Sequence, residues 1–237
     1  MCSTSGETLE VRWDELGPNI WTAWRPLKFL GVSMGTRMTV VRTAAGKLWL
    51  HSPYDPGAQV RQQMDELGPV SYAVCPNRMH HMLVGQILEL YPEARLFLST
   101  ALPKKRPDLA HGQVLGDDCP KEWEGDIRVL RLQGHPWLDE QIFLHQPSGT
   151  LILTDLMWCV DEEFSAPVRG FARLVGQYEK HVVMPEIRIS FTDKKAARAT
   201  VEAILDWDFD RVVLAHGPIV RENGKNVFRE AFGFLGV

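Results

Sequence analysis

Short apolar stretches separated by polar turns run along the whole chain, and they predict a mixed α/β protein. Runs rich in β-branched residues, bounded by Gly, Pro, Asn or Asp, indicate strands. Apolar residues at helical spacing, ended by Gly or Pro, indicate helices. The expected strands are residues 19–30, 38–43, 48–51, 70–75, 95–99, 126–132 and 211–215, and two more on either side of a Pro-Ser-Gly hairpin, the second of which ends at Asp155. The expected helices are residues 59–67, 82–90, 171–178, 193–207 and 223–234, with Thr192 as the N-cap of the fourth.

The order of these elements predicts the layers of the fold. Strands and helices alternate in the first half, further strands follow one another up to about residue 155, and helices and one strand close the chain. Because each sheet must cover its apolar faces, this order favours two sheets packed together between outer layers of helices. No repeat, low-complexity tract or linker divides the chain, so we expect a single domain over residues 1–237.

Side chains that can bind metals come directly after the expected strands in four places. These residues are His80 and His81, His135, Asp155 and His216. Strands provide the rigid frame that such a site needs, and their ends can bring distant residues together. Neutral imidazole and carboxylate groups suit Zn, Fe or Mn, so the pattern predicts a metal site or a substrate site. An ion with an open coordination position would lower the pKa of bound water to about 7 and supply a nucleophile.

This set of residues resembles the later motifs of the metallo-β-lactamase fold superfamily, over about residues 19 to 236. Gly134-His135 resembles the family's Gly-His turn, Asp155 its strand-end Asp that bridges two metals, and His216 its closing His. The Pro-Ser-Gly-Thr hairpin between His135 and Asp155 is similar to the family's usual connection. The resemblance implies a four-layered αββα sandwich of the metallo-β-lactamase type, with Zn or Fe as the cofactor.

The family's main motif, His-x-His-x-Asp-His, is not preserved. The corresponding loop reads Asn77-Arg-Met-His-His-Met82. Starting the motif at Asn77 puts His81 at the Asp position, and a shift by one puts His80 and His81 at the Asp and His positions. Neither register restores the His-x-His pair, but His81 is a candidate ligand in both, so we expect His81→Ala to lower metal occupancy. His51 stands where the family has a supporting strand-end Asp, and it could contact the ligands.

The resemblance implies a metal-dependent hydrolase with a small-molecule substrate, which the sequence does not identify. His81, Asp155 and His216 would hold the main metal, and His135 and His80 would add to it. Asp155 would also be catalytic, because it could orient the attacking water or accept its proton. The alternative is a degenerate, non-catalytic member of the fold that binds a small molecule or a protein partner. The missing His-x-His pair supports this alternative, and fold alone does not separate the two.

Several of these side chains also have a purely structural interpretation. His135 can be a turn residue that bonds to the backbone, and His51 can be hydrogen-bonded in the core. Trp137 and Trp158 could wall an apolar pocket or pack in the core. Arg78 could bind an anionic group of a substrate or lie on the surface.

Composition and charge narrow the partners and the location. Apolar residues make up 45% of the 237 residues and charged residues 24%, as in an ordinary globular protein. The formal net charge of −4 gives no indication of a nucleic-acid partner. No segment reaches the roughly 20 apolar residues that cross a bilayer, and residues 1–7 do not resemble a signal peptide. Because Cys2, Cys75, Cys119 and Cys159 form no paired motif, we expect reduced thiols in a cytoplasmic protein.

Overall fold

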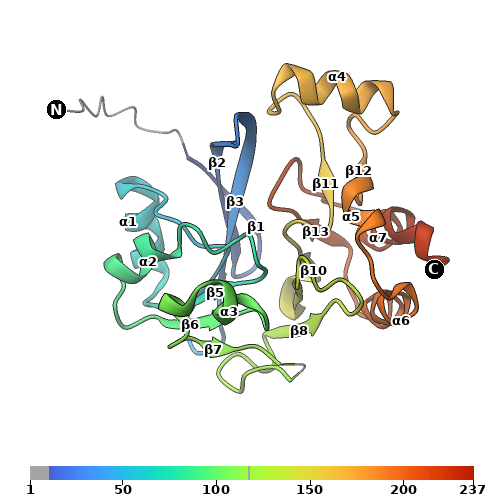
Figure 1. Cartoon of the computed structure of the whole chain (residues 1–237). Helices are drawn as coiled ribbons and strands as arrows, with labels where there is room; N and C mark the ends of the chain where they lie inside the picture. The colour runs from blue at the N-terminus through green and yellow to red at the C-terminus, as the bar shows by residue number, and fades with distance from the viewer. Residues whose placement is uncertain (1–10, 117) are drawn as a thin grey trace.

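Two β-sheets pack face to face, and helices cover the outer face of each (Figure 1). The computed structural model describes residues 11–116 and 118–237. The predicted four-layered αββα sandwich is therefore confirmed. None of the described helices combines the length and the hydrophobicity that a membrane span requires.

The strands of the first sheet are adjacent in chain order. They are β1 (Arg12–Gly17), β2 (Ile20–Phe29), β3 (Val32–Arg42), β4 (Leu48–His51), β5 (Val70–Cys75), β6 (Arg95–Leu98) and β7 (Gln113–Val114). β1 to β4 pair antiparallel, and β4 to β7 pair parallel. Parallel neighbours need crossover connections, which contain α1 (Ala58–Leu67), α2 (Val84–Leu90) and α3 (Leu102–Lys105). Val60, Met64 and Ile87 pack these helices against the sheet.

The second sheet has the strand order β13-β10-β9-β8. Its strands are β8 (Ile127–Arg131), β9 (Gln141–His145), β10 (Thr150–Ile152) and β13 (Arg211–Val213). β10 pairs antiparallel with β9 and parallel with β13. The helices on its outer face are α5 (Pro185–Ile189), α6 (Lys194–Leu205) and α7 (Gly224–Phe232), and they bury side chains such as Ile187, Val201 and Phe228.

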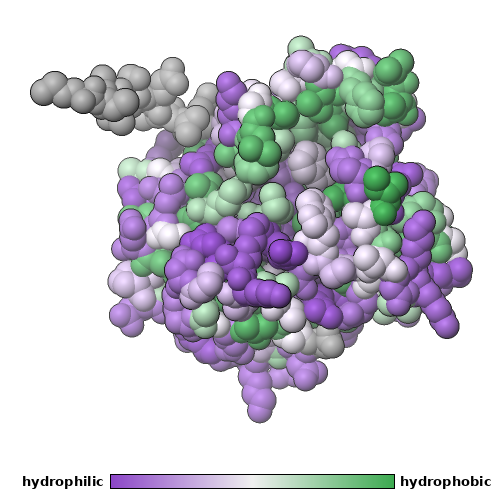
Figure 2. All heavy atoms as spheres, in the orientation of Figure 1, coloured by the Kyte–Doolittle hydropathy of each residue, from purple (hydrophilic) through white to green (hydrophobic). Residues whose placement is uncertain are grey.

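The remaining elements are short. β11 (Trp158–Cys159) and β12 (His181–Val182) form a two-stranded sheet, and α4 (Ala166–Leu174) lies at the end of the sandwich near the β2–β3 hairpin (Figure 1). Ala172 of α4 packs against Met34 and Phe164, whereas Phe171 and Leu174 are exposed. Hydrophobic side chains consequently gather over α4 on the surface (Figure 2). Three 3₁₀ helices cover Pro107–Leu109, Gln146–Ser148 and Gly233–Leu235.

The core between the sheets follows from side-chain alternation along the strands. In β4, Leu48 and Leu50 face the helices while Trp49 faces the second sheet. The Trp49 ring packs edge-on against Phe143 of β9, with ring centroids 5.1 Å apart, and against Trp123 at 5.5 Å. These ring contacts pack the first sheet against the second.

Most predicted elements are present, with shifted bounds. α6 begins after Asp193 rather than Thr192, because the Asp193 side chain accepts the backbone N–H of Ala196. α4 spans Ala166–Leu174, whereas the predicted helix spans residues 171–178. β1 is not predicted from the sequence, because it has few of the β-branched residues that mark a strand. Cys75, Cys119 and Cys159 have free thiols, and Cys2 lies outside the described residues.

Candidate metal centre

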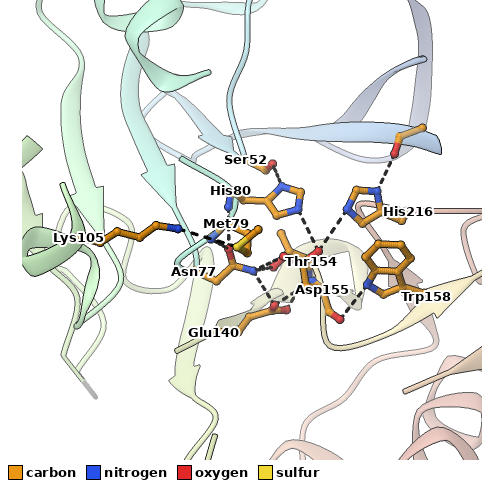
Figure 3. Close-up of polar contacts among 11 residues, drawn as sticks. Ser52, Asn77, Met79, His80, Lys105, Glu140, Thr154, Asp155, Trp158 and His216 are labelled. Carbon is orange, nitrogen blue, oxygen red and sulfur yellow. Dashed lines mark hydrogen bonds and ion pairs between the residues drawn. The ribbon is translucent and has the colours of Figure 1, made fainter. Parts of the chain in front are cut away.

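Three of the predicted ligands converge at one edge of the sandwich: His80, Asp155 and His216 (Figure 3). One possible ligand atom from each lies within 4.8 Å of the others. The Nε2 atoms of His80 and His216 lie 3.3 Å and 3.2 Å from the same oxygen, Asp155 Oδ1. All three side chains are almost completely shielded from solvent.

The strand register explains why Asp155 and His216 meet. Ile152 of β10 pairs with Val213 of β13 in a parallel ladder. Asp155 and His216 each follow their paired residue by three positions, so both leave the sheet at the same edge. His80 comes from the other sheet, in the loop between β5 and α2. The predicted convergence of residues at strand ends therefore holds for these three residues.

The hydrogen bonds of His216 indicate a cation between its ring and Asp155. His216 Nδ1 lies 2.6 Å from the carbonyl oxygen of Gly35, which can only accept, so Nδ1 carries the hydrogen. In a neutral ring Nε2 then presents a lone pair, here toward a carboxylate oxygen. Two lone pairs at this distance repel each other unless a proton or a metal ion lies between them.

The donor set fits a metal ion, and so do the two distances between Asp155 and the histidines. Zn²⁺ binds imidazole and carboxylate at about 2.0–2.2 Å, which places neighbouring ligands of a tetrahedral site roughly 3.3–3.5 Å apart. The two Nε2–Oδ1 distances of 3.2 Å and 3.3 Å lie close to this value. Two histidines and one carboxylate with open positions also suit non-haem iron. The Nδ1 of His80 bonds to Ser52 Oγ at 2.5 Å, which orients its Nε2 toward the carboxylate.

Charge within the cluster shifts the pKa of its members. Burial by itself raises the pKa of Asp155, but the charges and hydrogen bonds of His80 and His216 outweigh burial and hold that pKa well below its usual range. Burial lowers the pKa of His80, but the Asp155 carboxylate more than offsets it and leaves the pKa raised. The arrangement thus favours a negative carboxylate facing positive charge.

A buried polar network of Glu140 and Asn77 fixes the position of Asp155. Glu140 is fully buried and accepts the backbone N–H of Thr154 at 2.7 Å and that of Asp155 at 2.9 Å. Asn77 Nδ2 donates to Glu140 at 2.9 Å and to Asp155 Oδ2 at 2.8 Å, while Asn77 Oδ1 accepts the backbone N–H of His80 at 2.8 Å. Burial, and next the Asp155 charge, raise the pKa of Glu140. Asn77 therefore connects the loop that carries His80 to the loop that carries Asp155.

The turn that carries His216 is fixed by Arg37 and Gly217. Arg37 of β3 is buried, and its Nη1 donates to the carbonyl oxygens of Leu214 and Gly217, on either side of His216. Burial lowers the pKa of Arg37 to about 10. Gly217 has φ +95°, and a Cβ there would lie 2.1 Å from the carbonyl oxygen of Cys159. Only glycine fits this close approach.

The structure does not bring His81 into the cluster. Its Nδ1 lies 2.9 Å from Nη1 of Arg106, which is a donor only. Burial, and then the charges of Lys105 and Arg106, lower the pKa of His81 to about 4. The expected preference for His81 over His80 is therefore corrected: the turn that Asn77 caps points His80 toward Asp155 and His81 away from it.

His135 also lies outside the cluster. Its Nε2 is 2.8 Å from Ser190 Oγ and 3.3 Å from the carbonyl oxygen of Ile187, and its ring packs on Phe191 with centroids 4.5 Å apart. These contacts match the structural alternative, a turn histidine, and correct its expected role as a ligand. The preceding Gly134 explains the position, since a Cβ there would lie 2.0 Å from the carbonyl oxygen of Asp193.

Of the other residues for which the sequence leaves a functional and a structural role open, some lie at the site and others do not. His51 is buried, with its ring 5.7 Å from that of Trp49, and it is not part of the ligand group. Arg78 donates to the backbone carbonyl of Trp137, at 3.3 Å. Trp158 lies at the site, because its ring is 4.3 Å from that of His216 and its Nε1 donates to the carbonyl of Asp155. Trp137 is 54% exposed.

A cavity of about 300 Å³ opens onto the three ligands. Its walls are mainly apolar and come from the β2–β3 hairpin, the segment 79–83 and Trp158. The lining residues are Leu27, Phe29, Met34, Thr36, Ser52, Pro53, Tyr54, Met79, His80, Met82, Leu83, Asp155, Trp158 and His216. The arrangement therefore combines a polar floor of two imidazoles and one carboxylate with apolar walls, as small-molecule sites do.

A family model described as a domain of unknown function (DUF4336) matches residues 18–180. The chain belongs to this family. The matched segment of this DUF4336 protein includes His80 and Asp155, whereas His216 lies beyond it. No curated protein matches the chain.

Solved structures with the same fold include metallo-β-lactamases. A metallo-β-lactamase from Pontibacter korlensis is 12% identical, with a TM-score of 0.65 over 96% of this DUF4336 chain and 99% of that chain. The metallo-β-lactamase FIM-1 from Pseudomonas aeruginosa, in a mono-zinc form, is 12% identical, with a TM-score of 0.64 over 95% and 94%. The Flv1 flavodiiron core from Synechocystis sp. PCC6803 is 13% identical, with a TM-score of 0.65 over 96% and 61%. The predicted metallo-β-lactamase fold is confirmed.

Asn77 and Glu140 were not among the predicted site residues. In the sequence, Asn77 stands at the first His position of the family's motif, which does not indicate its hydrogen bonds. Glu140 lies in the polar run Asp139-Glu-Gln141, which is typical of an exposed turn. A buried carboxylate needs several donors, and those of Glu140 come from positions 77, 154 and 155. No local pattern connects these positions.

Proposed function

We propose that this protein is a metal-dependent hydrolase in which His80, Asp155 and His216 hold one Zn or Fe ion. The observation that carries the proposal is the convergence of three ligand atoms within 4.8 Å at the floor of an apolar cavity. The mono-zinc and flavodiiron neighbours support the choice of metal. Two histidines and one carboxylate form a common catalytic ligand set that leaves a position open for water.

The protein's own groups have separate parts in this proposal. When bound, the ion would lower the pKa of water and polarise a carbonyl group. Asp155 has its pKa held low, and a carboxylate with a low pKa is a poor proton acceptor. We therefore assign Asp155 to holding the ion and orienting water rather than to removing its proton. Ser52 and Gly35 fix the rings of His80 and His216 through their Nδ1 atoms.

Metal analysis of neighbouring histidine variants tests the proposal. We expect about one equivalent of Zn or Fe in untagged wild-type protein by plasma mass spectrometry, and a loss of about tenfold or more in His80→Ala. His81→Ala is the matched control, since it removes the same group one residue away, and it should retain the metal. This reverses the expectation from the sequence. Normal metal in His80→Ala together with loss in His81→Ala would refute the ligand set.

The alternative is a non-catalytic protein of this fold that binds a small molecule in the same cavity. It is favoured by Asn77 and Met79, which stand where the resemblance expects histidines. Asn77 uses both its side-chain nitrogen and its side-chain oxygen in hydrogen bonds to protein groups. Wild-type protein that contains no metal, and that takes up none when Zn or Fe is added, would support this alternative. A proton would then occupy the place between His216 and Asp155.

A further inference from the structure

We propose, on the basis of the hydrolase function above, that the substrate is an uncharged carboxylic ester with an apolar acyl group of medium length. Hydrolysis would form a bond from the water oxygen to the acyl carbon and break the bond from that carbon to the alcohol oxygen. The products are the carboxylate, the alcohol and one proton. Three properties of the cavity carry this inference: its walls, its charge and its size.

The walls of the cavity are apolar on several sides. Leu27, Phe29 and Met34 come from the β2–β3 hairpin, and Met79 and Met82 from the loop before α2. Thioether and aromatic side chains adapt to irregular apolar groups. Such walls favour an apolar chain that lies across the cavity while its carbonyl reaches the floor.

The charge of the walls disfavours an anionic group on the acyl chain. Among the described residues that line the cavity there is no Lys or Arg. Lys105 lies 4.0 Å from Met79 Sδ, but its ammonium bonds to the carbonyl oxygen of Arg78. An anion buried against these walls would lack a partner, and an unpaired buried charge is strongly unfavourable. An acyl chain that carries a carboxylate therefore does not fit.

The titratable groups of the lining favour an ester over an amide. The lining contains His80, Asp155, His216 and Tyr54. The first three form the ligand cluster, and the Tyr54 hydroxyl donates to the carbonyl of Ala23, so it is not available to the substrate. An amine leaving group needs a proton from a general acid, and none remains among these groups. An alcohol leaves more readily without one.

The size of the cavity limits the acyl group. A volume of about 300 Å³ lies at the lower end of the roughly 300–1,000 Å³ of ligand pockets, and it holds roughly ten water-sized groups. A hexanoyl chain fits these limits. Each methylene buried should improve kcat/KM about fourfold until the cavity is full.

Two matched pairs of probes test the inference. For turnover, metal-loaded protein is assayed with p-nitrophenyl acetate, butyrate and hexanoate, and with the p-nitrophenyl monoester of adipate. The adipate monoester has the same chain length as hexanoate but carries a carboxylate in place of the terminal methyl group. For binding alone, the fluorescence of uncharged N-phenyl-1-naphthylamine is compared with that of its anionic relative 1-anilinonaphthalene-8-sulfonate. We expect hexanoate to be hydrolysed on the order of a hundredfold more efficiently than acetate or the adipate ester. The uncharged dye should bind at least about tenfold more tightly than the sulfonate.

A charged substitution in the cavity wall tests the effect of charge directly. Leu27 is half-buried in the hairpin, so Leu27→Lys can place an ammonium at the cavity while the core stays intact. We expect it to reverse the preference, with the sulfonate dye binding more tightly than the uncharged one. Leu90→Lys is the control, because Leu90 is partly exposed on α2 and does not line the cavity. It should behave like the wild type.

The outcomes separate this inference from the proposed function. Turnover that ignores chain length or prefers the adipate ester, or equal binding of the two dyes, would overturn the uncharged apolar substrate and leave the hydrolase in place. The hydrolase proposal would be refuted if no ester were turned over while the wild type still preferred the uncharged dye and Leu27→Lys reversed that preference. The cavity would then stand as a binding site for uncharged apolar ligands.

Discussion

Asn77→Asp replaces the amide NH2 group at the centre of the buried network with an oxygen. We expect the resulting loss of unfolding free energy to grow as the pH rises. Asn77 is fully buried. The two N–H groups of its Nδ2 are shared among three acceptors, Asp155 Oδ2 at 2.8 Å, Glu140 Oε2 at 2.9 Å and Thr154 Oγ1 at 2.8 Å. Its Oδ1 accepts two backbone N–H groups, and an aspartate would keep both of those bonds.

The magnitude follows from the three carboxyl groups that would meet in this variant. Three like charges in contact cannot all be ionised, so the folded variant must bind one more proton than the wild type. The pKa of an aspartate in an unfolded chain is about 3.9, and each pH unit above it costs about 1.4 kcal/mol of unfolding free energy. The cost is therefore about 1.5 kcal/mol at pH 5 and about 4 kcal/mol at pH 7. Lost hydrogen bonds add a penalty that does not change with pH.

Urea unfolding of metal-free wild type, Asn77→Asp and Asn77→Ala at pH 5, 6, 7 and 8 measures this effect. The difference in unfolding free energy between wild type and Asn77→Asp should grow by about 1.4 kcal/mol per pH unit. Asn77→Ala adds no titratable group and removes only the hydrogen bonds by which Asn77 stabilises the charged carboxylates, so its difference should change less with pH than that of Asn77→Asp. A pH-independent difference for Asn77→Asp would show that this side chain does not donate to the two carboxylates.

Two further predictions concern groups outside the cluster. His145 is buried, its Nε2 has no hydrogen-bond partner among the described residues, and burial lowers its pKa to about 4. The unfolded chain binds this proton from about pH 6.5, so stability is lost as the pH falls toward 4. Between pH 7 and 4 the wild type should therefore lose about 3 kcal/mol more unfolding free energy than His145→Gln, measured by urea titration with the exposed His111→Gln as control. Gly217→Ala should cost about 2–4 kcal/mol in thermal unfolding, because its Cβ would overlap the Cys159 carbonyl. Gly176→Ala, also at positive φ but in open space, should cost about 1 kcal/mol; equal losses would contradict the close contact.

The sequence predicted those site residues whose positions depend on strand register. Asp155 and His216 each follow an apolar strand, and the ends of neighbouring strands meet at the edge of a sheet. The choice between His80 and His81 could not be made in this way. It depends on the Asn77 side chain, which accepts the backbone N–H groups of the turn and sets its direction.

His135 shows a second limit of sequence reasoning. Its Gly-His turn has the pattern of a ligand, and the turn is indeed present. The ring is held by Ser190 and Phe191, from a segment about 55 residues away that had no clear helical or strand pattern. Contacts between distant segments of irregular structure therefore decided its role, and no local pattern reports them.

The candidate centre lies across the contact between the two sheets, and this explains the presence of a buried arginine. His80 and the groups that orient both rings belong to the first sheet, whereas Asp155 and His216 follow strands of the second. The ligand distances therefore depend on how the sheets are aligned. Arg37 of the first sheet bonds to two carbonyls of the second, beside His216. A buried cation without a carboxylate partner is unfavourable for stability, and the lowered pKa of Arg37 reflects this. An apolar side chain would fill the same space at lower cost, but it could not fix the position of the His216 turn relative to β3.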